Sequence, residues 1–205
     1  MKPTPLIISM FLSALIMAAP ARAVAAQSAQ SWLDEQGYVA PNGGRIIACH
    51  GYGCVRRTTI SLDGAWLNRA SAILRTGRGS PDAERRALSE VVRSYTAYLA
   101  ASFGGRPDVP RSPPQMSGLS GQMDCLDETA NTTSLLLVLQ EKGLLAHHRV
   151  ARPESRGFFI DGRYPHFTAI VEEKQTGRGW AVDPWTRAPG QHPDILPLSR
   201  WRQDI

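Results

Sequence analysis

Apolar residues recur at helical spacing in two stretches of the first half of the chain. The first stretch, Leu62 to Leu74, repeats them every three or four residues, as on the buried face of an amphipathic helix. The second begins at Ser80 and Pro81, because a hydroxyl cap and a proline both suit the start of a helix. It is predicted to end near Phe103, and its buried face comprises Leu88, Val91, Val92, Tyr95 and Leu99.

A third helix is predicted from Cys125 to Lys142. Asp124 is a suitable N-cap for it, and Gly143 is a suitable stop. The apolar block 135–139 makes the far end of this helix apolar most of the way round. Such a pattern is typical of a helix that is buried against a sheet.

Strand patterns occupy much of the remaining chain. Residues 166–173 have the pattern of a strand, 175–179 that of a turn and 180–183 that of the returning strand of a hairpin. Pro184 ends this hairpin, because proline has no amide hydrogen to donate. A buried helix followed by an antiparallel hairpin predicts an α+β fold with additional N-terminal helices. Further short extended pieces are predicted at 45–48, 144–150 and 157–160.

Two long stretches lack periodicity. Residues 24–44 have the pattern of a mobile lead-in with a short helical turn near Trp32, so that a single domain would span 45–205. The loop from Arg106 to Ser120 contains four prolines and leads towards the third helix. Long loops in compact domains are often functional, and the sequence is equally compatible with a plain surface connection.

The N-terminal residues have the pattern of an export signal. Lys2 supplies a positive charge, residues 6–19 are nearly all apolar, and small residues stand at the two positions that a signal peptidase recognises. The apolar run is too short to span a bilayer comfortably, which takes about 20 residues. We therefore expect residues 1–23 to be removed, with cuts at Ala25 or Ala26 as alternatives, and a periplasmic or secreted protein. An uncleaved anchor or a buried N-terminal helix is the rival interpretation.

The charge of the chain is modestly basic. The formal net charge is +5, from 23 Lys and Arg residues and 18 Asp and Glu residues. Removal of Lys2 and Arg22 with the signal leaves 21 basic residues against 18 acidic ones, a net charge of +3. These basic residues are scattered and do not form the stripe of a nucleic-acid-binding protein, so no nucleic-acid partner is expected.

Three cysteines are present in the sequence. Cys49 and Cys54 enclose a short segment with two glycines, and nearby cysteines of an exported protein tend to pair, so we expect a disulfide between them. Metal binding by Cys49, His50 and Cys54 is the rival hypothesis, but it lacks a fourth ligand and matches no common zinc spacing. Pairing the first two leaves Cys125 as an odd thiol that is either reactive or buried and inert.

Cys125 stands where the proline-rich loop is predicted to become a helix. A thiol at a helix N-terminus lies at the positive end of the helix dipole, which favours the thiolate. We therefore expect Cys125 to be a nucleophile, although a lone cysteine before a helix is more often a small buried apolar residue. Asp127 and Glu128 oppose this hypothesis, because two acids in the first turn would raise the pKa of the thiol unless they point away.

The hairpin holds the candidate partners of this thiol. His166 begins one strand and Asp183 ends the next, 17 positions later, so the two are expected about opposite each other. The imidazole could take the thiol proton, and the carboxylate could fix its tautomer. A register error of one residue would turn one of them to the other face. The oxyanion would be stabilised by the backbone amide of Cys125 or, more weakly, by Gln122.

Residues 125–185 resemble the core of the transglutaminase-like superfamily, the papain-like group of cysteine peptidases and acyl transferases. In that core a helix opens with Cys, a His begins a strand further on, and an Asp ends the next strand; here the Cys and the His are 41 positions apart. The run from Trp180 to Pro184 is similar to its strand end, and the whole chain resembles exported bacterial members. The resemblance implies a papain-like fold and a triad of Cys125, His166 and Asp183.

The resemblance also implies a reaction, which is acyl transfer through a thioester without a cofactor or metal. We expect hydrolysis of a peptide or isopeptide bond, or transamidation to an amine, with a protein or peptide as the substrate. Two other functions stay open. The chain could be an exported binding module that keeps this fold without turnover, or a thiol–disulfide redox protein that uses Cys49 and Cys54.

Overall fold

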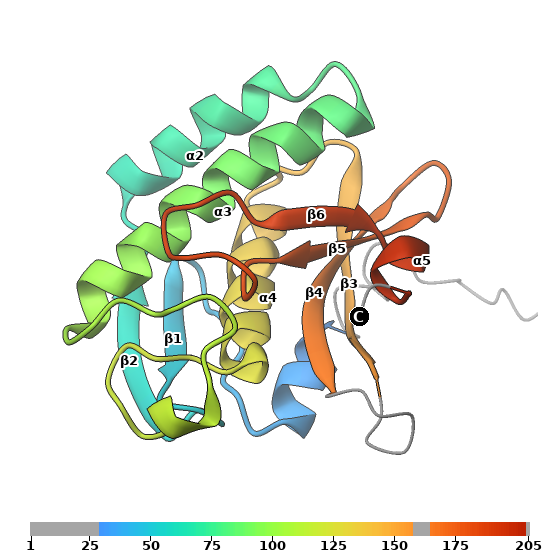
Figure 1. Cartoon of the computed structure of the whole chain (residues 1–205). Helices are drawn as coiled ribbons and strands as arrows, with labels where there is room; N and C mark the ends of the chain where they lie inside the picture. Colours follow the sequence, from blue (N-terminus) through green and yellow to red (C-terminus); the bar gives the residue numbers. More distant parts are fainter. Residues whose placement is uncertain (1–28, 158–164, 204–205) are drawn as a thin grey trace, which may run out of the picture.

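The computed structural model of the chain describes residues 29–157 and 165–203 (Figure 1). The expected signal peptide, residues 1–23, lies outside the described residues, and so does most of the expected extended piece at 157–160. The described chain folds into helices and two antiparallel sheets, which confirms the predicted α+β class. Among the described helices, none is both long enough and apolar enough to span a bilayer.

The smaller sheet is a hairpin of two antiparallel strands, β1 (Arg45–His50) and β2 (Arg56–Ser61). The structure extends the expected piece at 45–48 by two residues to make β1. The sequence of β2 carries no strand signal, because Ile60 is its one buried residue and the strand lacks an alternating apolar pattern. The turn between β1 and β2 contains the segment between Cys49 and Cys54.

The larger sheet has four antiparallel strands in the order β3–β4–β5–β6, each paired with its neighbour in sequence. The predicted hairpin of 166–173 and 180–183 is therefore confirmed, and β6 extends it by one strand. The sequence of β6 gives a weak signal, because the strand is short and ends in a proline. The four strands are β3 (His148–Arg156), β4 (His166–Glu173), β5 (Gly179–Asp183) and β6 (Asp194–Pro197).

Helix α4 (Cys125–Glu141) lies between the two sheets (Figure 1). It contacts β1 on one side and both β3 and β4 on the other. All its side chains from Asp127 to Gln140 are buried, as the apolar block 135–139 predicts for its far end. Because two sheets pack on this helix, its N-terminus is held at a fixed place at one end of the molecule.

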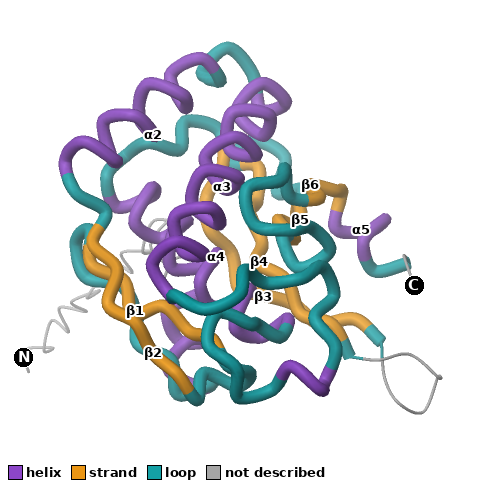
Figure 2. Tube along the Cα trace, turned by 60° about the vertical axis from the view of Figure 1, so that its left-hand side comes forward, coloured by secondary structure: helices purple, strands orange, loops and turns teal. Residues whose placement is uncertain are grey.

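The two predicted N-terminal helices are present as α2 (Gly64–Thr76) and α3 (Pro81–Phe103). Asp63 and Ser80 cap them, and each side chain accepts a hydrogen bond from a backbone amide in the first turn. The cap at Asp63 places Leu62 before the helix, so α2 begins two residues later than its apolar pattern. The two helices lie side by side (Figure 2), and α3 contacts β2 and β6, so it bridges the two sheets.

The segment before β1 packs into the domain from residue 29 onwards. Residues 29–35 are helical, and Trp32 and Leu33 are buried. The ring of Trp32 lies 6.2 Å from the ring of Phe167 in β4, measured between centroids. In this part the structure therefore differs from the expected lead-in. The segment has too few apolar residues to show a period, and its burial depends on contacts that are distant in sequence.

Two short helical elements complete the described chain. η1 (Pro114–Met116) is a turn of 3₁₀ helix inside the proline-rich loop, and α5 (Leu198–Trp201) follows β6. In Figure 1 the loop that contains η1, in yellow-green, lies at the lower end of the molecule together with the start of α4. α5 contacts β5 and β6, which places it against the strand that ends in Asp183.

Candidate functional site

Cys125 is the first residue of α4, at the position the sequence predicts. The Asp124 side chain caps the helix by accepting a hydrogen bond from the Asp127 amide at 2.8 Å. The hydroxyl of Thr129 donates to the carbonyl oxygen of Cys125 at 2.6 Å. These bonds fix the first turn of α4 and therefore the direction in which the Cys125 side chain leaves the helix.

The sulfur of Cys125 is buried against the start of β4. Its thiol donates to the carbonyl oxygen of Pro165 at 3.9 Å, and the backbone amide of Phe167 hydrogen-bonds to the sulfur. The residue between these two contacts is His166. The structure therefore brings the sulfur against the backbone on both sides of the histidine that the sequence selects.

The pKa of the Cys125 thiol is raised to about 11. Burial is the main cause, and the negative charges of Asp124 and Asp183 add to it, while the backbone amides of Phe167 and Cys125 act in the opposite direction. The expectation that the helix dipole favours the thiolate is therefore corrected, because burial outweighs the dipole. The resting side chain is a neutral thiol at neutral pH.

His166 and Asp183 are directly hydrogen-bonded. Nε2 of His166 lies 2.6 Å from Oδ2 of Asp183, and both side chains are buried. Ala169 lies opposite Val182, so the register places Thr168, and not His166, opposite Asp183. The pair is thus diagonal by two residues, and an even offset keeps both side chains on the same face of the sheet.

Two tryptophans that the sequence analysis did not select surround this pair. The indole nitrogen of Trp201, in α5, donates to Oδ2 of Asp183 at 2.9 Å. The centroid of the His166 ring lies 4.6 Å from that of Trp185 and 5.6 Å from that of Trp201. The histidine is therefore held between two large rings, and its partner carboxylate accepts a second hydrogen bond. Both tryptophans follow Asp183 in sequence, but neither belongs to a recognisable motif.

The second ring nitrogen of His166 has no hydrogen-bond partner among the described residues. Nδ1 is buried, and the Cys125 thiol donates to Pro165 instead, so the expected hydrogen bond between thiol and imidazole is not formed. The bond to Asp183 assigns the proton to Nε2, which leaves a lone pair on Nδ1. A base that accepts the proton of Cys125 needs such a lone pair, and the sulfur contacts the backbone on both sides of His166. Contacts between a thiol and its base are often loose before substrate binds.

Gln122 does not serve as the expected oxyanion donor in this structure. Its side-chain nitrogen donates to the carbonyl oxygens of Arg106 and Pro107, at 3.1 and 2.9 Å. Its side-chain oxygen accepts from the hydroxyl of Ser112 at 3.3 Å. Both amide hydrogens are therefore occupied in fixing the proline-rich loop. The position of Gln122 three residues before the nucleophile could not distinguish a catalytic role from this structural one.

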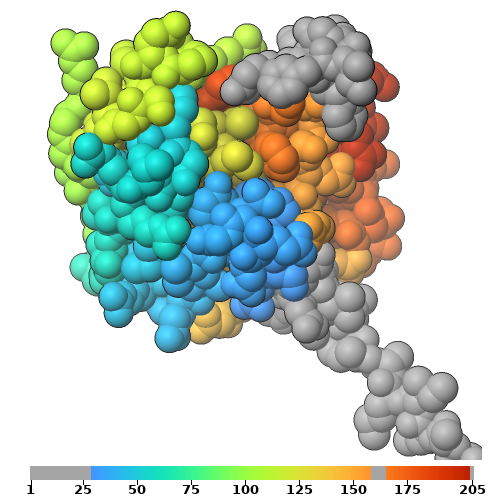
Figure 3. Space-filling view, turned by 90° about the horizontal axis from the view of Figure 1, so that it is seen from below, coloured from blue at the N-terminus to red at the C-terminus, as the bar shows by residue number. Residues whose placement is uncertain are grey.

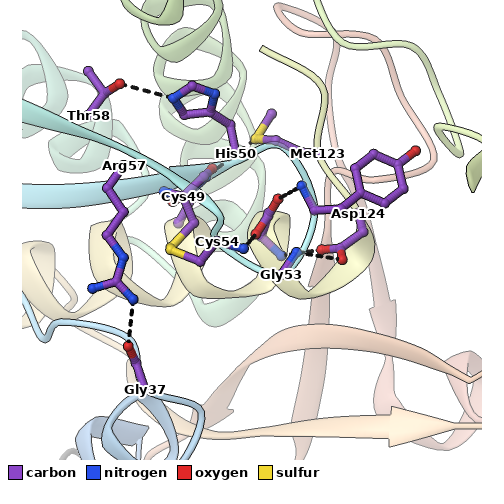
Figure 4. The surroundings of a disulfide bond; sticks show 12 residues. Gly37, Cys49, His50, Gly53, Cys54, Arg57, Thr58, Met123 and Asp124 are labelled. Carbon is purple, nitrogen blue, oxygen red and sulfur yellow. Dashed lines mark hydrogen bonds between the residues drawn. A yellow bond between two sulfur atoms is a disulfide. The ribbon is translucent and has the colours of Figure 1, made fainter. Parts of the chain in front are cut away.

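The predicted disulfide between Cys49 and Cys54 is present and buried (Figure 4). The turn that it closes presents its backbone to the first turn of α4. The amides of Tyr52 and Cys54 donate to the two carboxylate oxygens of Asp127, at 2.8 and 2.7 Å. Figure 4 shows the amide of Gly53 donating to Asp124, a bond of 2.9 Å. Both carboxylates of the nucleophile's helix start are therefore tied to the disulfide turn.

This turn has an unusual backbone. Tyr52 and Cys54 have φ angles of 70° and 59°, in the left-handed region that residues with a Cβ rarely occupy. Gly51 and Gly53 have positive φ as well. Each non-glycine residue costs about 1–2 kcal/mol in this region, so the contacts to Asp127 and the disulfide must hold the turn in place.

The two acids of the first turn do not contact the thiol in the way the sequence suggested. Asp127 faces the disulfide turn, and its pKa is raised to about 7 by burial and then by Asp124. Glu128 is buried, and its Oε2 has no hydrogen-bond partner among the described atoms. Burial, followed by the charges of Asp108, Asp183 and Asp127, raises the pKa of Glu128 far above its usual range. The surroundings of Glu128 consequently favour its protonated, neutral form.

A cavity of about 520 Å³ lies beside Cys125. Segments far apart in sequence form its walls: the disulfide turn, the proline-rich loop, the start of α4, and the residues that flank His166 and Asp183. Figure 3 shows atoms of the start of α4, in yellow, between that loop and the orange atoms of β4. The cavity is lined by Tyr52, Arg111, Ser112, Pro113, Pro114, Asp124, Cys125, Leu126, Pro165, Phe167 and Trp185.

One group of side chains has the spacing of metal ligands. Among the described residues, the sulfurs of Cys49 and Cys54 and a carboxylate oxygen of Asp127 lie within 4.8 Å of one another. The two sulfurs are joined in the disulfide, and the nitrogens of His50 are close to Thr58 and to the amide of Gly121. The rival hypothesis of metal binding by Cys49, His50 and Cys54 therefore has no free thiolate in this structure.

Comparison of the chain with protein-family models, with curated proteins and with solved structures found no match in any of the three.

Proposed function

We propose that the chain is a thiol acyl-transfer enzyme in which Cys125, His166 and Asp183 act together, with the papain-like arrangement of the transglutaminase-like superfamily. The observation that carries the proposal is the 2.6 Å hydrogen bond between His166 and Asp183. The sulfur of Cys125 contacts the backbone on both sides of this histidine. The hydrogen bond to Asp183 leaves Nδ1 of His166 without a partner on the side of the ring remote from Asp183. The substrate would be a peptide or isopeptide amide, with hydrolysis favoured over transamidation.

The chemistry begins from a neutral thiol, because burial raises the pKa of Cys125 to about 11. Nδ1 of His166 accepts the thiol proton as the sulfur attacks the acyl carbon, and Asp183 stabilises the imidazolium that forms. The His166 proton then passes to the leaving amine, which departs as the thioester forms. Attack by water on the thioester releases the acid and restores the thiol; attack by an amine gives transamidation.

The oxyanion of the tetrahedral intermediate needs a donor. The backbone amide of Cys125 meets this need, because the first amides of a helix have no acceptor within the helix. It also lies at the positive end of the α4 dipole, which stabilises a developing negative charge. Gln122 is the weaker candidate for this role, because its amide hydrogens are engaged by the proline-rich loop.

The redox alternative has weaker support. A disulfide that exchanges with thiols must expose a sulfur to attack. Cys49 and Cys54 are only 1% and 5% exposed, and the amide of Cys54 is bonded to Asp127. A binding module would have the same cavity but would not form the thioester at Cys125. A test of Cys125 acylation therefore distinguishes a binding module from an enzyme.

The proposal is tested by the acetylation of Cys125 with p-nitrophenyl acetate. The Cys125 sulfur bonds to the acetyl carbon, the ester bond breaks, and p-nitrophenolate leaves, while His166 takes the thiol proton. Mapping of the acetyl group by peptide mass spectrometry, together with the rate of p-nitrophenolate release, reports the reaction. We expect the folded protein to react at Cys125 at least about 100-fold faster than the unfolded protein, the size of effect typical of general-base catalysis.

Two variants control this experiment. His166→Ala should lower the rate of acetylation to that of the unfolded protein, because no other base replaces Nδ1. His192→Ala is the matched control, because His192 is exposed and lies on the loop before β6. Equal rates for the native protein, His166→Ala and the unfolded chain would favour a binding module instead.

A further inference from the structure

We infer that the cavity beside Cys125 receives the acyl side of the substrate and selects a large apolar side chain, aromatic or branched aliphatic, next to the reacting carbonyl. This inference rests on the proposed function and adds the substrate class. It follows from which atoms face the cavity, from how the charged groups of its wall are engaged, and from its size.

The walls of the cavity are mainly carbon surface. Three aromatic residues, Tyr52, Phe167 and Trp185, come from three different segments and line the same space. Leu126, next to the nucleophile, adds an aliphatic side chain. Prolines from the loop and from the start of β4 supply the rest. Aromatic and aliphatic walls with few polar groups are typical of pockets that bind apolar ligands.

Several polar atoms of these walls are engaged with one another, although the buried indole nitrogen of Trp185 has no hydrogen-bond partner among the described residues. The hydroxyl of Tyr52 donates to the carbonyl oxygen of Pro113 at 2.6 Å and lies 2.8 Å from the hydroxyl of Ser112. The amide of Arg111 donates to the carbonyl oxygen of Trp185 at 2.8 Å. These bonds join the proline-rich loop to both neighbouring walls, so the cavity is fixed in shape before a substrate arrives.

The two charged residues of the wall lie in different surroundings. Both carboxylate oxygens of Asp124 accept backbone hydrogen bonds, one from Asp127 and one from Gly53. Arg111 is exposed at the rim, where its charge acts on Asp194. A charged substrate side chain that entered the aromatic part of the cavity, away from Arg111, would lose its hydration without gaining a partner, which is unfavourable.

The size of the cavity agrees with this class of substrate. About 520 Å³ lies within the usual range of small-molecule pockets, which is roughly 300–1,000 Å³. This volume is larger than a methyl side chain requires, and it can hold an aromatic ring together with part of the adjoining substrate chain. Because burial of a phenylalanine side chain contributes about 1.5–3 kcal/mol, a site that uses the cavity should prefer it to alanine by about 10- to 100-fold.

Three matched esters test the inference: the p-nitrophenyl esters of N-acetyl-phenylalanine, N-acetyl-alanine and N-acetyl-glutamate. In each case the Cys125 sulfur forms a bond to the acyl carbon, p-nitrophenolate leaves, and the thiol proton goes to His166. The second-order rate of acylation of Cys125 is measured from p-nitrophenolate release, and the site of acylation is mapped by peptide mass spectrometry. Hydroxide-catalysed hydrolysis of each ester without protein corrects for intrinsic reactivity.

We expect the corrected rates to follow the order phenylalanine, alanine, glutamate, with phenylalanine about 10- to 100-fold faster than alanine. Equal rates for all three esters would overturn the assignment of the cavity and leave the proposed acyl transfer intact. Faster acylation by the glutamate ester would overturn it as well. If no ester acylates Cys125 faster than the unfolded protein, the proposed function itself fails, and this inference fails with it.

A variant of a cavity residue tests whether the preference for the phenylalanine ester arises in the cavity. Phe167→Ala removes one aromatic wall and keeps the backbone amide that bonds to the Cys125 sulfur, so the ratio of the phenylalanine rate to the alanine rate should fall at least about 5-fold. The alanine ester serves as the internal reference for folding and chemistry in the same variant. Val109→Ala is the matched control, because Val109 is an exposed residue of the same loop region and does not line the cavity. An unchanged ratio in Phe167→Ala would contradict the assignment.

Discussion

Cys125 illustrates how burial can outweigh a helix dipole. Its position at the start of α4 favours a thiolate, but burial and the neighbouring charges of Asp124 and Asp183 raise its pKa to about 11. An acid with a raised pKa stays protonated to higher pH, so the thiol is neutral across the physiological range. The base for the reaction must therefore act during the attack and not before it.

The pH dependence of alkylation tests this protonation state. We expect the rate of Cys125 labelling by iodoacetamide in the native protein to keep rising up to about pH 10, because the thiolate fraction is still growing there. In protein unfolded in urea the rate should level off above about pH 9, near the ordinary pKa of a cysteine. A native rate that is already level at about pH 7 would indicate a stable thiolate–imidazolium pair and would contradict the raised pKa.

Glu128 gives a second prediction for a single residue. Its pKa is raised far above its ordinary value, chiefly by burial, so the folded state retains a proton that the unfolded chain releases above about pH 4.3. The stability associated with that proton is complete below the unfolded pKa and is lost as pH rises towards the folded pKa. Glu128→Gln should abolish this loss, because glutamine is neutral at every pH and has a similar shape.

Melting temperatures between about pH 4 and about pH 8 measure this effect. The melting temperature of Glu128→Gln should exceed that of the parent protein by an amount that grows with pH. Glu141→Gln, an exposed position on the same helix, is the matched control and should show no such trend. A parent protein that gains stability relative to Glu128→Gln as pH rises would show that the carboxylate is the favoured form.

At this scale the sequence predicted some of the site and missed the rest. The positions of Cys125, His166 and Asp183 followed from element boundaries, because helix starts and strand ends carry local signals. Trp201 and Tyr52 did not follow, because each reaches the site through contacts between segments far apart in the chain. Gln122 is the opposite case: it is close to Cys125 in sequence, but its side-chain amide donates to the proline-rich loop.

Helix α5 is a short element that the site depends on. The indole nitrogen of Trp201 donates to the same carboxylate oxygen of Asp183 that accepts from His166. A hydrogen bond to a charged group contributes about 1.5–3 kcal/mol, so its loss should weaken both the position of Asp183 and the docking of α5. Trp201→Phe should therefore lower the rate of Cys125 acetylation by about 10-fold or more, because a loss of about 1.5–3 kcal/mol in the transition state corresponds to a factor of this size.

A second tryptophan provides the control for this prediction. Trp180 also lies in the larger sheet, but its indole nitrogen is buried and has no hydrogen-bond partner within the described part of the chain. Trp180→Phe therefore removes a similar volume and no hydrogen bond. Equal acetylation rates for Trp201→Phe and Trp180→Phe, both near the parent rate, would contradict a role of Trp201 in holding the carboxylate.

The disulfide turn is the second element with a testable role. A disulfide that closes a loop this short stabilises the folded chain by about 2 kcal/mol through the entropy of the unfolded state. The turn also donates three amides to Asp124 and Asp127, so reduction should loosen the first turn of α4. Because both sulfurs are buried, dithiothreitol is added to the chain unfolded in urea, which is then refolded and freed of reductant. We expect the reduced protein to have an unfolding free energy lower by about 2 kcal/mol and a slower acetylation of Cys125.

The matched control is the double variant Cys49→Ala and Cys54→Ala. This variant should have the stability of the reduced protein and should not respond to dithiothreitol. If the reduced protein unfolded at the same urea concentration as the oxidised protein and reacted equally fast, the turn would have no part in holding the nucleophile.

The elements themselves were predictable to different degrees. α3 has a long periodic pattern and α4 a long apolar block, both have local caps, and both begin at the predicted residue. β2 has one buried side chain, and residues 29–35 have two large anchors without a period, so neither shows a pattern in sequence. Their burial depends on residues that are distant in sequence and close in the fold. Local propensity carries no information about such contacts.

Across the whole molecule, one buried acid joins the helical layer to the larger sheet. Glu84 in α3 accepts hydrogen bonds from the amides of Ala146, His147 and His148 and contacts the His148 ring at 2.9 Å. Although burial opposes it, these bonds hold the pKa of Glu84 below its ordinary value. The contribution is present above the unfolded pKa and is lost as pH falls through the folded pKa.

Glu84→Gln should therefore be strongly destabilising. Each buried donor left without an acceptor typically costs about 1–3 kcal/mol, and the loss would be measured as the free energy of unfolding in urea at neutral pH. Glu90→Gln on the same helix is the control, because its pair with Arg93 is partly exposed and contributes less than about 1 kcal/mol. A loss as small as that of Glu90→Gln would show that α3 does not depend on Glu84 to join the sheet.

The most direct test of the account is whether His166 and Asp183 act as one unit on Cys125. The rate of Cys125 acetylation by p-nitrophenyl acetate is measured for His166→Ala, Asp183→Asn and the double variant. Residues that work through one another have non-additive effects, so we predict that the double variant reacts no more slowly than His166→Ala alone. Losses that multiply in the double variant, or an unchanged rate in His166→Ala, would contradict the proposed triad.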